Sequence, residues 1–365
     1  GFDLIGVTLA GGEGTIAYDG ALFYGMGGAL LVLEPLTLVI AETRFRDNVA
    51  FFAGAAVAIV EIAYPPLLQD LEFDGNLIAG APGGGGAAIY YDSAEILQIR
   101  RALFVGNRVT NTDPNPAAES NGGAIWIPYP VGSALNLEEC TFSANEATGA
   151  GGAIAFGLPT QNAGVVARIW ATTFTGNLPD TNHNSTPQSG GALYLGWNSD
   201  STTLTNSIVA GNVDGSTAAN PAHDLVGGTA VLTSGGYNRI GIRAGAAAVF
   251  PVGLPNANHD WVGTSGSPLA PGLDPLADNG GPTRTHRPQA ILGILDQGSC
   301  STSYYDQRDW TGTTGRRLFD NVAIADADDG CDIGALELGL SPPAEIFADD
   351  FEWGDFRYWS GVSGI

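Results

Sequence analysis

The stretch Gly-Gly-Ala-Ile at residues 122–125, followed by Thr-Phe-Ser-Ala-Asn at residues 141–145, is one copy of the unit that decides the fold. Six copies combine a Gly-Gly-Ala or Gly-Ala-Ala step with a large apolar residue three positions before an Asn, and in the sixth copy Val209 replaces the aromatic residue. The Asn residues lie 28 to 38 positions apart, and self-similarity at such a period indicates stacked repeats. The repeated residues are Phe45 and Asn48, Phe73 and Asn76, Phe104 and Asn107, Phe142 and Asn145, Phe174 and Asn177, and finally Asn212.

Within each copy the apolar residues alternate with polar ones, as at residues 135–137 and 141–143. A period of two is typical of β-strands, and Val, Ile, Thr, Leu and Phe prevail between turns of Gly and Pro. Short strands that recur without a helical partner favour a parallel β-helix, in which each coil pairs with the coils above and below. We therefore expect an all-β chain, a right-handed parallel β-helix of about seven coils.

The two repeated side chains have different expected roles. Phe lies on the inward phase, where copies from successive coils stack on one another. Asn tolerates a positive φ, so we expect it to turn the corner of the coil and to hydrogen-bond through its amide to the Asn of the next coil. The residue before each Phe position points outward and is mostly polar, but Leu103 and Ile208 depart from this rule.

The coils differ in length mainly between each Asn and the next Ala of the repeat. Insertions that collect at one corner place variable loops on one face of the solenoid, which either binds a ligand or simply tolerates insertions. The longest of these loops span residues 108–121 and 178–189. Both interpretations of this face stay open.

The charge of the chain excludes one class of partner. Its 365 residues include 14 basic residues, all of them Arg, and 38 acidic residues, which gives a net charge of −24. A chain this acidic does not bind nucleic acid or an anionic membrane through a basic patch. It contains no run of 18 apolar residues, so we expect no transmembrane helix.

The cysteines and the start of the chain favour export. Cys140 falls on the inward phase of a coil and is expected to be a buried free thiol. Cys300 and Cys331 bracket a loop-rich stretch, where a disulfide contributes roughly 3–4 kcal/mol and indicates an oxidising compartment. The strand-like pattern begins at Phe2, which favours a processed N-terminus. We therefore expect a secreted protein.

The chain divides into three parts. Residues 1–237 carry the coils, and residues 238–338 are expected to form a cap, tied by the disulfide, over the last coil. Residues 339–365 form a tail rich in aromatic residues, which we expect to dock on the protein itself or on a neighbouring copy. Association through the stackable ends of the coils is also available to a β-helix. The aromatic residues of the tail are Phe347, Phe351, Trp353, Phe356, Tyr358 and Trp359.

These motifs resemble those of two groups of secreted bacterial proteins. The alternation of Gly-Gly-Ala-Ile with Phe-x-x-Asn is similar to the repeats of polymorphic outer-membrane proteins, which are surface β-helix adhesins. The segments at residues 235–238, 278–286, 306–308 and 331–335 resemble the "choice-of-anchor Q" proteins, which are secreted right-handed β-helices with interchangeable C-terminal anchoring segments. The resemblance implies the fold and a location outside the cell or at the cell surface of a bacterium, and it implies no particular activity.

An enzyme is the alternative, because many right-handed β-helices are polysaccharide lyases or hydrolases. A hydrolase needs carboxylates that face one cleft, and we find no column of acids at one position of the coil. A lyase needs a base and a group that neutralises a uronate. Arg100 and Arg101, beside Glu138 and Glu139 of the next coil, form either such a cluster or a cross-coil salt bridge, and we favour the salt bridge. We assign no catalytic residue.

Calcium is the one cofactor for which the sequence offers candidate ligands. Residues 326–330 are similar to a calcium-binding loop but lack its third ligand. The alternative interpretation is a polar turn beside the disulfide. The candidate ligands are Asp326, Asp328, Asp329 and Asp332.

The sequence predicts a secreted structural or adhesive protein of a cell surface or extracellular matrix. Its expected partners are further copies of the chain, joined through the tail or the coil ends into oligomers or fibres, and a glycan or another surface ligand. A carbohydrate-active enzyme, either a polysaccharide lyase or a hydrolase, is the alternative. A column of acids or Arg residues with aromatic platforms on one side of the solenoid would favour the enzyme.

Overall fold

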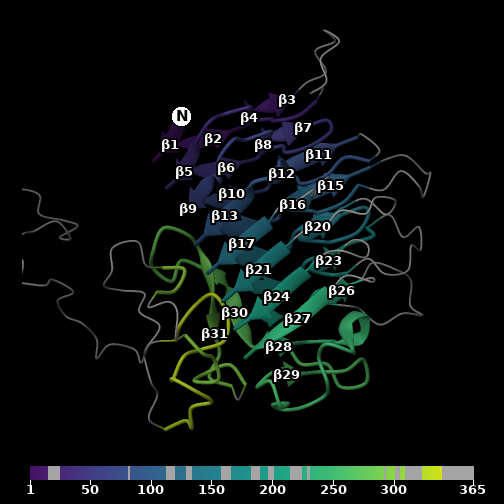
Figure 1. Ribbon diagram of the computed structural model, residues 1–365, viewed down its shortest axis with the longest axis vertical. Helices are drawn as coiled ribbons and strands as arrows, with labels where there is room; N and C mark the ends of the chain where they lie inside the picture. The colour runs from purple at the N-terminus through teal and green to yellow at the C-terminus, as the bar shows by residue number, and fades with distance from the viewer. Residues whose placement is uncertain are drawn as a thin grey trace, which may run out of the picture.

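The chain forms a right-handed parallel β-helix, as the repeats predict (Figure 1). Its strands stack along the long axis of the molecule, from β1 at the N-terminal end to β29. The part of the chain that the structure describes contains no helix with the length and apolar composition needed to cross a bilayer. The computed structural model describes residues 1–14, 25–80, 83–111, 120–128, 134–157, 166–181, 190–195, 201–213, 224–227, 231–291, 293–300, 305–308 and 323–338.

Two long parallel sheets meet at one corner of the coil. The first sheet contains β1 (Phe2–Ile5), β5 (Leu38–Ala41), β9 (Leu67–Gln69), β13 (Ile96–Arg100), β17 (Ala134–Glu138), β21 (Val166–Trp170), β24 (Ser201–Thr205) and β27 (Val231–Gly236). The second sheet contains β2 (Thr8–Ala10), β6 (Arg44–Arg46), β10 (Glu72–Asp74), β14 (Leu103–Val105), β18 (Thr141–Ser143), β22 (Thr173–Thr175), β25 (Ile208–Val209), β28 (Arg239–Ile240) and β29 (Trp261–Val262).

Two shorter sheets complete each coil. The third sheet contains β3 (Glu13–Gly14), β7 (Val49–Ala50), β11 (Leu77–Ala79), β15 (Arg108–Thr110) and β19 (Glu146–Ala147). The fourth sheet contains β4 (Leu30–Leu33), β8 (Val57–Val60), β12 (Ile89–Asp92), β16 (Ile125–Ile127), β20 (Ile154–Phe156), β23 (Leu193–Leu195) and β26 (Leu225–Gly227). Each coil contributes one strand to the fourth sheet, so its described strands agree with the expected number of coils.

The interior repeats the same residues from coil to coil. Five Phe rings, from Phe45 to Phe174, are stacked with centroids 4.4–5.0 Å apart. Each amide from Asn48 to Asn177 donates to the Oδ1 atom of the next Asn at 2.8–2.9 Å. From Asn76 onward, the second amide N–H donates to the carbonyl oxygen of a stacked Phe at 3.0–3.1 Å. The predicted Phe stack and Asn ladder are therefore confirmed.

The backbone at the Asn corner differs from the expectation. The residue with a positive φ is the one before the Asn, for example Asp47 at 51° and Ala144 at 53°, and not the Asn itself. The chain turns the corner one residue earlier than predicted. The role of the Asn is the hydrogen bond that its side-chain amide makes to the next coil. In the Gly-Gly-Ala step the first Gly has the positive φ, 64° at Gly122, and a side chain on Gly123 would collide with the carbonyl oxygen of Gly152.

Two interior rows of polar side chains end on a carboxylate. Asn212 donates to Oδ1 of Asp224 at 2.9 Å, and Asn238 donates to Oδ1 of Asp260 at 2.9 Å. Burial raises the pKa of Asp224 to about 6, although the hydrogen bonds from Asn212 and Ile242 act in the opposite direction. A carboxylate accepts N–H donors from both sides, so it can end a row that an amide would have to continue.

Only the first part of the predicted cap, residues 238–338, covers the last coil. β28 and β29 extend the second sheet past residue 237, so the domain boundary expected there lies inside this sheet. Strand pairing continues beyond the last recognisable repeat because it needs backbone groups and not the repeat residues. The short 3-10 helix η1 (Ala244–Ala246) and the buried Phe250 then pack against the end of the core.

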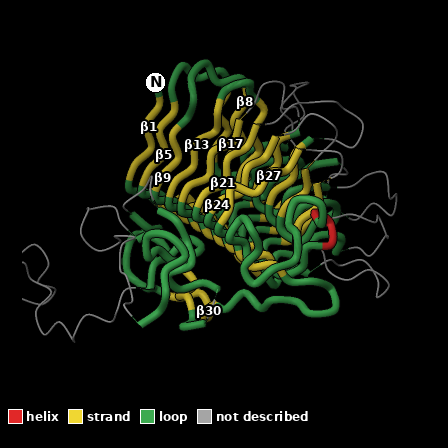
Figure 2. Tube along the Cα trace, turned by 60° about the horizontal axis from the view of Figure 1, so that its bottom comes forward, coloured by secondary structure: helices red, strands yellow, loops and turns green. Residues whose placement is uncertain are grey.

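The described residues between 271 and 338 lie beside the solenoid and are called the flank segment (Figure 2). It begins with an antiparallel hairpin of β30 (Leu273–Ala277) and β31 (Thr285–Pro288). The flank segment, which we expected to cover the end of the coils, therefore covers their side. The physical reason is a set of apolar and polar contacts with the second sheet, described below.

The predictions for the three cysteines are confirmed. Cys300 and Cys331 form a disulfide within the flank segment. Cys140 is a buried free thiol, and burial raises its pKa to about 12, which keeps it unreactive. The predicted docking tail at residues 339–365 lies outside the described residues, as do the central parts of the two long loops, residues 112–119 and 182–189.

Candidate functional site

One row of outward side chains on the second sheet carries the flank segment and is called the outer column. It occupies the position before each Phe of the repeat, where neighbouring strands are in register. In contrast to the interior rows, the outer column changes residue type at almost every coil. The repeat therefore does not determine which residue occupies each of its positions. The outer column consists of Thr8, Arg44, Glu72, Leu103, Thr141, Thr173, Ile208, Arg239 and Trp261.

The two apolar exceptions noted in the sequence belong to this column. Leu103 and Ile208 point away from the interior, yet both are fully buried. Ile208 packs with Trp261, Ile294 and Ile333 in an apolar cluster between the second sheet and the flank segment. These outward apolar residues therefore mark where the flank segment lies against the coils.

Hydrogen bonds fix the flank segment to the same column. The Thr141 hydroxyl donates to the side-chain oxygen of Gln307 at 2.6 Å, and the backbone N–H of Ala335 donates to the Thr173 hydroxyl at 3.1 Å. Gln307 is fully buried and also donates to the carbonyl oxygen of Ala102 at 3.3 Å. Thr141 and Thr173 of the outer column are thus each matched to a group of the flank segment.

His286 adds a further anchor as a neutral imidazole. Its Nδ1 lies 2.8 Å from the carbonyl oxygen of Asp274 and therefore carries the hydrogen. Its Nε2 is then left to accept from the Ser143 hydroxyl, at 2.9 Å. Burial lowers the pKa of His286, and the hydrogen bond to Asp274 opposes this shift. His286 is held inside a structural contact and does not face the cleft described below.

Arg284 anchors the hairpin to the third coil. Its guanidinium lies 2.6 Å from a carboxylate oxygen of Glu72 and 2.8 Å from one of Asp74. Burial by itself lowers the pKa of Arg284, but the hydrogen bond and charge of Glu72, together with Asp74, raise it above its ordinary value. Arg284, His286, Gln307 and Ala335 all lie in the motifs at residues 278–286, 306–308 and 331–335, so these motifs attach the flank segment.

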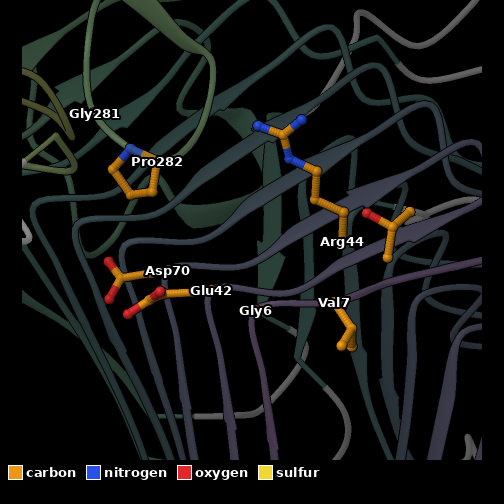
Figure 3. Close-up of a pocket in the computed structure, with 8 residues that line it drawn as sticks. Gly6, Val7, Glu42, Arg44, Asp70, Gly281 and Pro282 are labelled. Carbon is orange, nitrogen blue, oxygen red and sulfur yellow. The ribbon is translucent and has the colours of Figure 1, made fainter.

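A cleft of about 350 Å³ lies where the hairpin contacts stop. The described ion pairs of Arg284 reach Glu72, and the next residue of the outer column, Arg44, has a side chain that is 57% exposed. The turn between β30 and β31 projects over the place on the outer column where the contacts at Glu72 end and the exposed Arg44 follows (Figure 3). The cleft is lined by Gly6, Val7, Thr8, Glu42, Arg44, Asp70, Gly281 and Pro282.

Charged residues also recur at the corner between the first and second sheets. Glu42, Asp70, Arg101 and Glu139 occupy the same position of successive coils and all have φ between 49° and 58°. The sequence-based statement that no acids share a coil position is therefore wrong. The regularity was available in the sequence, because each of these residues precedes its ladder Asn by six positions.

Within this corner column, Asp70 and Arg101 form a tight pair. The guanidinium of Arg101 donates to both oxygens of Asp70, at 2.7 and 2.9 Å, and Asp70 is only 5% exposed. The neighbouring Glu42 is exposed, and Figure 3 shows its carboxylate beside that of Asp70, with the guanidinium of Arg44 on the other side of the cleft. The cleft therefore has one acidic wall and one wall with an Arg.

The cluster considered for a lyase forms ion pairs instead. Arg100 lies 2.8 Å from a carboxylate oxygen of Glu138, which confirms the cross-coil salt bridge that we favoured. Arg101 turns to Asp70 of the preceding coil, and Glu139 is buried. The structure therefore does not leave Arg100 and Arg101 as a free pair of bases.

The four candidate calcium ligands, all of them described, do not converge on one point. Asp332 is buried, and its two oxygens accept backbone N–H groups at 2.9 and 2.6 Å. Asp328 accepts a hydroxyl group and Asp329 accepts a backbone N–H. Asp326 is exposed on the same turn. This arrangement fits the alternative interpretation, a polar turn beside the Cys300–Cys331 disulfide.

Comparisons with protein-family models, with curated proteins and with solved structures find no match for this chain. Its class therefore follows from its own geometry: a parallel β-helix with a flank segment fixed along one side. Sequence reasoning assigned none of the residues that line the cleft to a site, and only Gly281 and Pro282 fall within a motif that it singled out, at residues 278–286.

Proposed function

We propose that the chain is a secreted structural or adhesive protein of a bacterial surface or extracellular matrix, and that it binds a saccharide in the cleft below Pro282. The observation that carries this proposal is the cleft itself, whose volume of about 350 Å³ suits a small sugar unit. Its polar side chains project from the strands and corners of stacked coils, and a hairpin anchored by Arg284 adds Gly281 and Pro282 to the lining. Such a lining is fixed before the ligand arrives, which reduces the entropic cost of binding.

The lining has the chemistry that hydroxyl-rich ligands need. The exposed carboxylate of Glu42 accepts hydrogen bonds from sugar hydroxyls, and the guanidinium of Arg44 donates to sugar oxygens. Thr8 and the backbone of Gly6 and Gly281 supply further polar groups. A solenoid with such a cleft on its side suits attachment to a glycan surface.

The state of Asp70 favours binding over hydrolysis. A glycosidase uses two carboxyl groups in one cleft, one of which delivers a proton to the leaving oxygen. In this cleft the second carboxylate is Asp70, and both its oxygens accept hydrogen bonds from Arg101. Asp70 therefore supports the cleft wall, and of the two carboxylates in the lining only that of Glu42 is exposed for contact with a ligand.

The proposal is tested by binding of the purified full chain to an immobilised panel of neutral and acidic glycans. We expect binding by the unmodified chain and by Glu13→Gln, an exposed carboxylate outside the cleft lining, and at least tenfold weaker binding by Glu42→Gln. No release of reducing ends or of unsaturated uronates is expected. Absence of binding across the panel would contradict adhesion, and cleavage that Glu42→Gln abolishes would establish the enzyme alternative instead.

Self-association and location are parts of the same proposal. The Cys300–Cys331 disulfide suits an oxidising compartment, and it supports secretion in this sense alone. Self-association is tested by negative-stain imaging and sedimentation of the full chain beside a truncation that ends at Ser341. Oligomers of the full chain alone would support assembly through the tail. If both proteins are monomeric, assembly is refuted while adhesion is unaffected.

A further inference from the structure

We propose that the cleft selects saccharides that carry a carboxylate or sulfate group, and that Arg44 and Arg46 bind this anionic group. The inference rests on the proposed function, because it names the ligand class of the same cleft. It follows from the way in which three guanidinium groups share two carboxylates on the second sheet.

Arg44 and Arg46 are held loosely by their own acidic neighbours. The side chains are 57% and 53% exposed, and their closest distances to Glu72 and Asp74 are both 3.6 Å, which is beyond hydrogen-bond distance. Arg284 binds the same two carboxylates at 2.6 and 2.8 Å. At Asp74, Arg284 binds the same Oδ2 atom that Arg46 faces, whereas at Glu72 it binds Oε1 and Arg44 faces Oε2. Arg44 lines the cleft and Arg46 lies two residues further along β6, so both guanidinium groups are exposed at or beside the cleft.

The positive and negative charges around the cleft are unevenly distributed between its two walls. Three guanidinium groups surround two carboxylates, which leaves a surplus of one positive charge at this place in a chain with 14 basic and 38 acidic residues. On the opposite wall the charge of Asp70 is matched by Arg101, and Glu42 is exposed. A ligand therefore meets a cationic wall and a hydrogen-bond-accepting wall, as a sugar with one acidic substituent requires.

The geometry of β6 suits an anionic group. Arg44 and Arg46 lie two residues apart on one strand and on the same face, with roughly 7 Å between their Cα atoms. A guanidinium presents a planar fork that binds carboxylate or sulfate through two parallel hydrogen bonds. Thr8 precedes Arg44 in the outer column and offers a hydroxyl for the sugar ring. The anion and the ring are thus recognised by adjacent residues.

The overall charge limits the length of the ligand. A net charge of −24 repels a long polyanion, since repulsion acts over about one Debye length, roughly 8 Å at physiological ionic strength. The Arg contacts act only at hydrogen-bond distance. We therefore infer that the ligand is a short oligosaccharide, or a chain end, with few charges.

The test measures binding to the full chain by titration calorimetry with four probes. These are trigalacturonic acid, the neutral galactose trisaccharide of the same linkage, a sulfated galactose disaccharide, and inorganic sulfate. The variants are Arg44→Gln/Arg46→Gln, the matching double Lys variant, and Arg100→Gln as control, since Arg100 is also half-exposed and ion-paired on the solenoid. Thermal unfolding verifies that each variant folds.

We expect at least one charged saccharide to bind tenfold or more tightly than the neutral trisaccharide. The double Gln variant should bind that saccharide no better than the neutral one, the double Lys variant should lose only part of the difference, and Arg100→Gln should behave as the unmodified chain. The charged probe that binds more tightly identifies the carboxylate or the sulfate as the recognised group.

Four outcomes would overturn the inference. Equal binding of charged and neutral saccharides would refute selection for an anion, and if Glu42→Gln weakens that binding the proposed function survives alone. Unchanged binding by the double Gln variant would refute the role of the two Arg residues. Inorganic sulfate that binds as tightly as the charged saccharides would refute saccharide recognition. Failure of all four probes to bind would refute this inference, whereas the proposed function would be refuted only by absence of binding across the glycan panel.

Discussion

The Asn ladder and the outer column are both made of one residue per coil, yet they follow opposite rules. The ladder repeats one residue from Asn48 to Asn212, whereas the outer column has six residue types in nine positions. Inside the solenoid, each Asn of the ladder faces the Asn of the next coil, so the same residue suits every coil. Outside, the positions from Glu72 onward face different groups, most of them in the flank segment, while Thr8 and Arg44 face the cleft, so no single residue suits the whole column.

The first prediction tests the interior rule by removing one rung. Asn107→Ala leaves the backbone and side-chain N–H groups of Asn76 and the carbonyl oxygen of Phe73 without their buried partners. Because each buried polar group left unpaired costs about 1–3 kcal/mol, we expect a loss of about 3–5 kcal/mol in the free energy of unfolding, measured in urea. Asn258→Ala, at an exposed position, should change it by less than about 0.5 kcal/mol.

A loss below about 1 kcal/mol for Asn107→Ala would contradict the view that the ladder is a coupled row. It would mean that water or a shifted neighbour replaces the missing amide. The comparison with the outer column would then lose its basis, since the ladder would not depend on matched neighbours.

The second prediction tests the outer rule at Ile208, which lies under the flank segment. Ile208→Ala opens a cavity in the cluster with Trp261 and Ile294, and we expect a loss of about 2–4 kcal/mol together with faster proteolysis of residues 271–338. Ile5→Ala, 55% exposed, serves as the control and should be nearly neutral. Equal proteolysis of both variants would show that the outer column does not hold the flank segment.

The third prediction concerns Asp224, the one charged member of the ladder. Its pKa is about 6 in the folded chain and 3.8 is its ordinary value, so the folded state binds more protons between these pH values. Lowering the pH from 7 to 4 should therefore stabilise the fold through this group by about 2 kcal/mol. Unfolding curves of the unmodified chain and of Asp224→Asn over this range should differ in slope, and parallel pH profiles would contradict the assignment.

The interior was predictable from the sequence because identical neighbours impose identical residues. Phe104 and Asn107 could be placed without any knowledge of distant parts of the chain. The corner column that begins with Glu42 and Asp70 has a regular spacing, six positions before each ladder Asn, but its residue type changes to Arg101, so it does not stand out as a column of acids.

The cleft could not be predicted in the same way. Pro282 lies far from Glu42 in the sequence, and no repeat relates the two residues. The sequence did contain a trace of the contact, since Leu103 and Ile208 are apolar where polar residues were expected. Such exceptions show that something covers the coil, but not which segment does so.

The direction of the Asn ladder gives the solenoid an electrical polarity. Every ladder amide donates toward the C-terminal end, so the side-chain dipoles add along the axis as peptide dipoles do in an α-helix. The positive end of this array meets the carboxylate of Asp224. A coil with its own Asn could therefore be inserted or removed in the middle of the stack without reversing any dipole, whereas a solenoid shortened from the C-terminal end would lose the charge that terminates the array.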